Sequence, residues 1–283
     1  MKKDGHVDPI IRQTLVRYFA GPLSNVSTPQ DAMTVLAMAV NHIQTETRRE
    51  YKDTASLLLG DVVDVRYDSS NVKIVPAFEE ETLKPCIIKF SSTSAVSREA
   101  TIYQRLHDSK LNFVPNEVVI VNYREPRAGG TIDKSVALKM PVFVASLVSV
   151  PKHVQEEVVH TRAATDILPA LAYMHSLNIY HMDVKLENIL VNEQGMWYLG
   201  DFGSCVSNAT EKSQITVSKK PRDLPHTPPS ARYDKILLAV ACLELTVDFL
   251  SKRAGFSLVD LKRAVEDELT NKDFQDFVRS LIE

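Results

Sequence analysis

Apolar residues recur at helical spacing in the first 50 residues of the chain. Two such runs, Ile10–Phe19 and Ala32–Ile43, are separated by Gly21-Pro22, and Ser27-Thr28-Pro29 offers a start signal for the second helix. We therefore expect residues 1–50 to form a helical extension. A pair of amphipathic helices needs only a surface to pack on, so this extension is predicted to brace the rest of the chain, with regulation or partner binding as the alternative.

A strand-rich part begins near Ala55. Apolar runs separated by turn residues predict strands at Leu57–Val65, Val72–Phe78, Cys86–Phe90, Val118–Val121 and Val136–Val144. Between the third and fourth of these strands, Ser92-Thr93-Ser94 offers a helix N-cap. The helix that follows has an apolar stripe that carries one acidic residue, Glu99.

The second half of the chain predicts mainly helices. Apolar spacing indicates one helical stretch at Val154–Leu177, with a kink at Pro169, and another at Ile236–Leu250. Between them lie two short apolar runs, Ile189–Val191 and Met196–Leu199. The residues that join these runs are Asn-Glu-Gln-Gly, whose glycine can adopt a positive φ, so we expect a β-hairpin.

Composition narrows the class of protein. With 283 residues, of which 44% are hydrophobic and 24% charged, the chain can bury one large core or two lobes. The formal net charge is −3, so we expect no nucleic-acid partner, and no apolar stretch approaches the roughly 20 residues of a membrane span. The start of the chain leads into no secretory apolar region, and the three scattered cysteines fit a reducing compartment. We therefore expect an intracellular protein of the cytoplasm or nucleus, of unknown oligomeric state.

The predicted hairpin brings oxygen ligands to one end. Its midpoint lies near Gln194, so antiparallel pairing places Asn188, just before the first strand, beside Asp201, just after the second. An amide oxygen and a carboxylate are hard donors suited to Mg²⁺. Asp183 lies five residues before Asn188 on the same loop and is placed to accept a proton from a hydroxyl.

The loop before this hairpin carries a family motif. The residues His-Met-Asp-Val-Lys-Leu-Glu-Asn at 181–188, followed by Asp-Phe-Gly at 201–203, resemble the catalytic loop and metal motif of the eukaryotic-type Ser/Thr protein kinases. The resemblance implies that Asp183 is the catalytic base and that Lys185 steadies the transferred phosphoryl group. It further implies that Asn188 and Asp201 hold Mg²⁺ or Mn²⁺, and that ATP is the phosphoryl donor.

The same resemblance assigns nucleotide contacts to the strand-rich part. Cys-Ile-Ile-Lys, which ends at Lys89, resembles the family's Val-Ala-Ile-Lys, and Glu99 is the expected ion-pair partner of this lysine. No Gly-x-Gly-x-x-Gly exists in the sequence, and spacing favours the turn that contains Ser69 and Ser70 as the loop over the phosphates. Met140–Val144 is the expected adenine-facing connector, with Met140 as its first residue.

Two later features follow the family pattern loosely. A polar segment after Gly203 corresponds to an activation segment, with hydroxyls at Ser204, Ser207, Thr210, Ser213, Thr216, Ser218 and Thr227. Met182 stands where many of these kinases have an arginine that pairs with a phosphorylated activation segment. Asp234 resembles the family aspartate that braces the backbone of the catalytic loop, and a helix-start acid favoured by the helix dipole is the alternative.

These observations predict an α+β, two-lobed protein-kinase-like fold over residues 51–283. The β-rich N-lobe is expected at about 51–144 and the helical C-lobe at about 145–283. The resemblance implies ATP-dependent phosphoryl transfer to Ser or Thr hydroxyls of a protein substrate. One alternative is a small-molecule kinase of the aminoglycoside or choline type, against which Lys185 argues. The other is a pseudokinase that acts as a binding module, which the missing glycine-rich loop favours.

Overall fold

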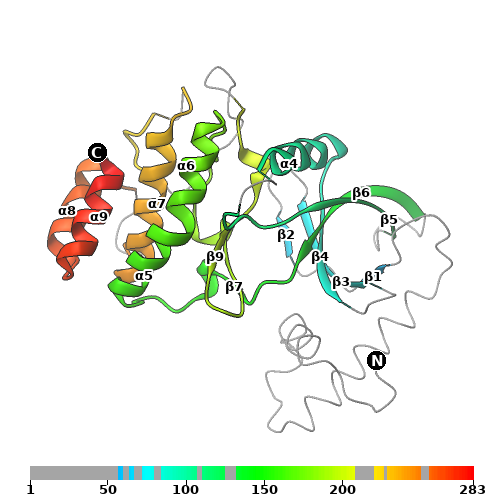
Figure 1. The fold of residues 1–283 in the computed structure, drawn as a ribbon, viewed down its shortest axis with the longest axis horizontal. Helices are drawn as coiled ribbons and strands as arrows, with labels where there is room; N and C mark the ends of the chain where they lie inside the picture. The colour runs from blue at the N-terminus through cyan, green and yellow to red at the C-terminus, as the bar shows by residue number, and fades with distance from the viewer. Residues whose placement is uncertain are drawn as a thin grey trace, which may run out of the picture. The chain divides into compact units, whose positions relative to one another are not determined.

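The computed structural model divides the chain into two compact units. It describes residues 57–59, 64–66, 72–79, 84–106, 110–124, 132–207, 220–225, 228–249 and 255–283 (Figure 1). The first unit comprises residues 1–100 and 115–142, and the second comprises residues 101–114 and 143–283. The helices expected within residues 1–50, and the turn with Ser69 and Ser70, lie outside the described residues.

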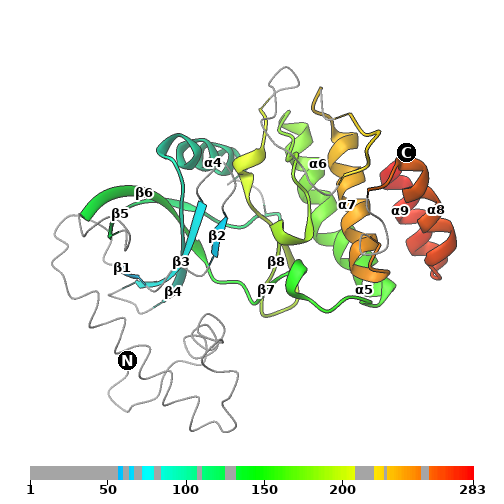
Figure 2. The same ribbon diagram turned by 180° about the vertical axis from the view of Figure 1, so that it is seen from behind.

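The first unit is built on an antiparallel sheet with the strand order β1-β3-β4-β6-β5, and β2 also pairs with β3. Its strands are β1 (Leu57–Leu59), β2 (Asp64–Arg66), β3 (Val72–Glu79), β4 (Pro85–Phe90), β5 (Glu117–Arg124) and β6 (Ile132–Pro141). The last two strands curve strongly along the sheet (Figure 2). Helix α4 (Thr93–Leu106) starts where predicted, because Ser92 Oγ accepts a hydrogen bond from the Ala95 N–H at 3.3 Å.

Two strand predictions need correction. The single strand expected at Leu57–Val65 is two short strands, β1 and β2, on different parts of β3. From the pair Leu59↔Ala77 to the pair Asp64↔Ile74 the chain advances five residues while β3 retreats three, so one continuous ladder is impossible. The strand expected at Val136–Val144 starts earlier and ends at Pro141, whose ring nitrogen has no hydrogen to continue a ladder.

Apolar side chains pack against both faces of this sheet at its central strands. Alternate residues of β4 point to opposite sides, so Cys86, Ile88 and Phe90 share one face. They cluster there with Val75, Ala77, Val119, Val121 and Ala137. On the other face Leu138 packs with Val96 and Ala100 of α4, and Lys89 pairs with Leu138 across the strands. The position of α4 therefore brings its residue Glu99 toward Lys89.

The second unit is mainly helical. Its helices beyond the end of α4 are α5 (Glu156–Arg162), α6 (Leu168–Ser176), α7 (Ala231–Thr246), α8 (Leu258–Glu268) and α9 (Lys272–Ile282). A small antiparallel sheet joins β7 (Ala145–Ser146), β8 (Ile189–Val191) and β9 (Trp197–Leu199). None of the helices that the structure describes is long and apolar enough to cross a bilayer.

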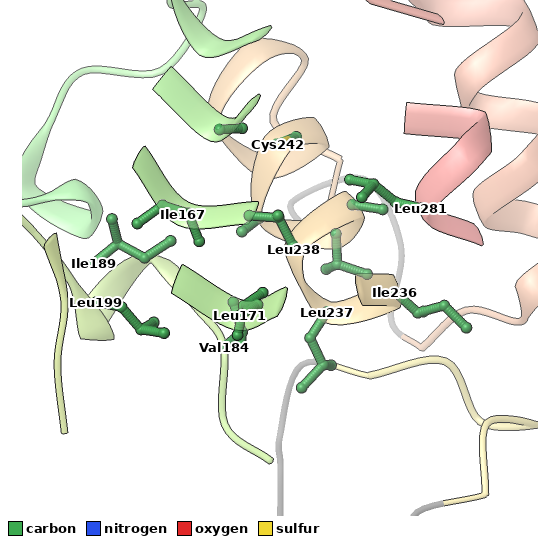
Figure 3. Close-up of a cluster of buried hydrophobic side chains, with 14 of the residues drawn as sticks. Ile167, Leu171, Val184, Ile189, Leu199, Ile236, Leu237, Leu238, Cys242 and Leu281 are labelled. Carbon is green, nitrogen blue, oxygen red and sulfur yellow. The ribbon is translucent and has the colours of Figure 1, made fainter. Parts of the chain in front are cut away.

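Helix α7 is the centre of this unit. Every residue from Ile236 to Thr246 is buried, because the sequence is apolar on nearly all sides of the helix. Helices α5, α6, α8 and α9 all contact it. Its side chains meet those of Ile167, Leu171 and Leu281 in one cluster (Figure 3). The helix begins at Ala231, earlier than expected, because Ser230 caps it, and it ends at Thr246.

The helical stretch expected at Val154–Leu177 is interrupted. A π-helical turn, Ala163–Ile167, separates α5 from α6. Pro169 lies just after the π turn, so its missing N–H removes a hydrogen-bond donor from a helix that continues on both sides. The interruption therefore lies at the π turn, just before the position where a kink was predicted.

Candidate active site

The hairpin of β8 and β9 brings two candidate metal ligands, Asn188 and Asp201, close together through its strand pairing. Gly195 adopts φ +74 in the turn, as its neighbours predicted, and the strands pair with Ile189 opposite Leu199. Asn188 therefore lies opposite Gly200, whose N–H donates to the Asn188 carbonyl oxygen at 2.9 Å. Asp201 is the next residue, so the predicted hairpin is confirmed.

Asp234 holds the backbone of the loop that precedes the hairpin. Its carboxylate accepts hydrogen bonds from the N–H groups of His181 and Met182, both at 2.8 Å. It also contacts His175 Nε2 at 2.8 Å. Met182 has φ +66, a conformation that costs energy for a residue with a side chain, and these bonds stabilise it. The bracing role expected of Asp234 is confirmed by this geometry.

Asp183 is fixed through one of its two carboxylate oxygens. Oδ2 accepts hydrogen bonds from Lys185 Nζ at 2.7 Å and from Asn188 Nδ2 at 3.0 Å. Among the described residues nothing hydrogen-bonds to Oδ1, although the residue is only 5% exposed. The carboxylate is thus held in one orientation while its second oxygen is available as a proton acceptor.

Asn188 and Asp201 have the chemistry of a hard-metal site. The Asn188 side-chain nitrogen donates to the Asp183 backbone oxygen at 2.8 Å as well as to its carboxylate, which fixes the amide orientation. The amide oxygen, Oδ1, is buried and has no hydrogen-bond partner in the described part of the chain. Asp201 has the left-handed angles φ +63 and ψ +69, an uncommon conformation that is frequent at functional sites. These oxygen donors fit Mg²⁺ or Mn²⁺.

Aromatic rings support the segment that follows Asp201. Phe202 is buried, and its ring centroid lies 6.2 Å from that of Tyr103, 6.0 Å from Phe113 and 6.0 Å from His181. His181 is also hydrogen-bonded through both ring nitrogens, since Nδ1 accepts from the Asp183 N–H at 3.3 Å. Nε2 must then carry the proton and donate to the Gly200 carbonyl oxygen at 3.1 Å. The ring of His181 therefore links the loop that carries Asp183 to the residue before Asp201.

A further buried carboxylate, Asp166, anchors the hairpin to the π turn. Its Oδ2 accepts from the Trp197 N–H at 2.9 Å, and its Oδ1 accepts from the Thr165 hydroxyl at 2.8 Å. Sequence reasoning missed this residue, because a single acid in a helical stretch gives no signal of its distant partner. The aromatic support from Tyr103 and Phe113 was missed for the same reason.

In the first unit, Lys89 and Glu99 form the predicted ion pair. Lys89 Nζ lies 2.8 Å from Glu99 Oε2, and both side chains are more than nine-tenths buried. Met140 requires a correction, because it lies inside β6, paired with Ile87, and the segment after the strand begins at Val142. The connector is thus shorter than expected at its N-terminal end.

The three cysteines are buried and form no disulfide. Burial raises the pKa of the Cys86 and Cys242 thiols to about 12, with the negative charge of Glu79 as a further cause for Cys86. Of the hydroxyls expected in an activation segment, Ser204 and Ser207 are described, and Thr210, Ser213, Thr216, Ser218 and Thr227 lie outside the described residues.

Comparisons with known proteins agree with this geometry. Residues 89–222 match the family described as protein kinase domain. The chain is 50% identical to the serine/threonine-protein kinase Sgk1 of Homo sapiens over 54 residues, which are 19% of this chain and 12% of that protein. It is 41% identical to the probable serine/threonine-protein kinase mkcD of Dictyostelium discoideum over 56 residues, 20% of this chain and 9% of that protein. The match to Sgk1 of Xenopus tropicalis is 53% over 45 residues, 16% of this chain and 11% of that protein. The chain thus spans about a tenth of the length of these relatives.

Proposed function

Because residues 89–222 match the protein kinase domain family, we propose that the chain transfers the γ-phosphoryl group of ATP to serine or threonine hydroxyls of a protein substrate. The observation that carries this proposal is the state of Asp183. One carboxylate oxygen is held by Lys185 and Asn188, and the other is left to receive a proton. A module that only binds a partner has no need for such an arrangement.

Asp183 acts as the base in this proposal. Its Oδ1 accepts the proton of the acceptor hydroxyl while the hydroxyl oxygen forms a bond to the γ-phosphorus. The bond between that phosphorus and the bridging oxygen breaks, and ADP leaves with its electron pair. The Lys185 ammonium, 2.7 Å from Oδ2, neutralises negative charge beside the reacting groups.

Six residues are proposed to contribute to nucleotide and metal binding. Lys89, oriented by its ion pair with Glu99, binds phosphate oxygens of ATP, and Ser69 and Ser70 contribute backbone amides to the same phosphates. Met140 contributes apolar contact to the adenine. Asn188 and Asp201 hold Mg²⁺ or Mn²⁺, which when bound supplies positive charge to the phosphate oxygens. Residues 51–283 are the proposed extent of the kinase domain, and residues 1–50 the proposed extension.

The test compares the full chain with its Asp183→Asn variant. Each is incubated with labelled ATP, Mg²⁺ or Mn²⁺, and a basic protein substrate, and ATP affinity is measured in parallel. Loss of a general base lowers rates by about 10²- to 10⁴-fold, so label on Ser or Thr should fall by that factor while ATP affinity stays similar. Asp267→Asn, an exposed aspartate on α8, is the matched control and should keep full activity.

Two other outcomes would favour a binding module or a small-molecule kinase over the proposed protein kinase. If the wild type binds ATP and labels none of the proteins offered, the chain is a binding module. If the wild type labels only a small alcohol such as an aminoglycoside or choline, it is a small-molecule kinase.

A further inference from the structure

Tyr233 is a buried tyrosine whose hydroxyl lacks a hydrogen-bond partner among the described residues. The residue is 1% exposed and lies in the first turn of α7, where its own N–H donates to Ser230 Oγ at 3.2 Å. A buried phenol hydroxyl usually finds a partner, because leaving it unpaired costs the free energy of its lost hydration. An unpaired hydroxyl at this place therefore indicates a ligand.

The neighbours of Tyr233 place it at the catalytic loop. The next residue, Asp234, accepts hydrogen bonds from the N–H groups of His181 and Met182, the two residues before Asp183. Leu237, one turn further along α7, shares a buried cluster with Val184, the residue after Asp183 (Figure 3). Helix α7, which carries Tyr233, and the loop that carries Asp183 are thus packed together in the second unit.

The hydroxyl of Tyr233 is a hydrogen-bond donor at neutral pH. Burial is the main cause that raises the pKa of this phenol above its usual range, and the negative charges of Asp234 and then Asp183 raise it further. The Asp183 carboxylate is thus one of the two charges that act on this phenol. The phenol therefore stays protonated in the presence of the catalytic carboxylate.

Tyr233 and Asp183 have complementary unfilled hydrogen-bonding capacity. Asp183 Oδ1 is a buried acceptor and the Tyr233 hydroxyl a buried donor, and the two are not bonded to each other. An aliphatic hydroxyl satisfies both, since it donates one hydrogen bond and accepts another. We propose that the Tyr233 hydroxyl binds the acceptor serine or threonine of the protein substrate, donating to the oxygen whose proton Asp183 accepts. This inference rests on the proposed function.

Such a contact orients the acceptor oxygen. Asp183 alone fixes the hydroxyl through its hydrogen, and the oxygen remains free to rotate about that contact. A second contact from Tyr233 restricts the direction of the lone pair that attacks the γ-phosphorus. The residue then contributes to the use of the protein substrate and makes no contribution to ATP binding.

The experiment compares wild type, Tyr233→Phe and, as a matched control, Tyr198→Phe on β9. Steady-state rates are measured with a peptide library that presents a central Ser or Thr, alongside the KM for ATP and the thermal midpoint. Loss of one neutral hydrogen bond should lower kcat/KM for the peptides about three- to tenfold in Tyr233→Phe, with the KM for ATP unchanged. Because the hydroxyl has no partner inside the described fold, the thermal midpoint should stay equal or rise.

Specific outcomes would overturn the inference. If kcat/KM for Tyr233→Phe lies within twofold of an active wild type, the hydroxyl does not touch the acceptor. A thermal midpoint that drops by several degrees would show that the hydroxyl is a structural hydrogen-bond donor. A wild type that labels no peptide overturns the proposed function and this inference together, which distinguishes that failure from the first two.

Discussion

Replacing Asp234 by alanine should weaken both the fold and the catalytic loop. Asp234 is fully buried, and its carboxylate accepts from the N–H groups of His181 and Met182 and contacts His175. Alanine leaves two buried N–H groups without an acceptor, and each such loss costs about 1–3 kcal/mol. We therefore expect the free energy of unfolding to fall by about 2–6 kcal/mol, a large part of the about 5–15 kcal/mol that stabilises an ordinary domain.

The conservative variant Asp234→Asn sharpens this prediction. An amide has one oxygen acceptor, and its NH₂ group can only donate, so one of the two N–H groups keeps a partner and the other loses it. Stability measured by urea unfolding should rank wild type above Asp234→Asn, and Asp234→Asn above Asp234→Ala. Hydrogen exchange at the amides of His181 and Met182 should accelerate in the same order. A loss below about 1 kcal/mol in Asp234→Ala, or unchanged exchange at both amides, would refute the bracing role.

Two further predictions concern the end of the hairpin. Gly200→Ala should lower the free energy of unfolding by about 1–3 kcal/mol through overpacking, because a Cβ there would lie 2.8 Å from Cγ2 of the buried, stiff Val114. Urea unfolding measures this loss. A double variant with Val114→Ala should recover most of it, and a lack of recovery would contradict the steric explanation. Asp201→Asn should abolish the thermal shift that ATP with Mg²⁺ produces in the wild type, since Asn188 is the other proposed oxygen ligand. An undiminished shift in Asp201→Asn would remove Asp201 from the metal site.

Local sequence was enough to predict the parts of the site that lie close together in the chain. The turn residues around Gly195 determine a tight hairpin, and the period-two pairing then brings Asn188 opposite Gly200 with little help from the rest of the protein. The Lys89–Glu99 pair was expected from the family resemblance, and a strand, a short turn and a capped helix separate the two residues by only ten positions. Turn geometry and helix capping act over a few residues, so their signals can be read directly from the chain.

Only the tertiary structure decided which distant groups meet. Tyr103 and Phe113 lie far from Phe202 in sequence, and the Asp166 carboxylate reaches the Trp197 N–H across 31 positions. The unpaired hydroxyl of Tyr233 was likewise found only in the tertiary structure. An amphipathic pattern predicts that a residue is buried and does not identify its neighbours.

The family resemblance supplied one long-range contact that spacing alone did not. Asp234 stands 53 positions from His181, and from the sequence alone a helix-start acid was nearly as good an interpretation of it. Strand boundaries were also beyond what the sequence pattern predicts. A change of pairing register on β3 divides β1 from β2, and the apolar pattern does not indicate it. Pairing register and helix packing depend on the summed fit of many side chains across the fold, so they are decided when the chain is folded and are not written in any one segment.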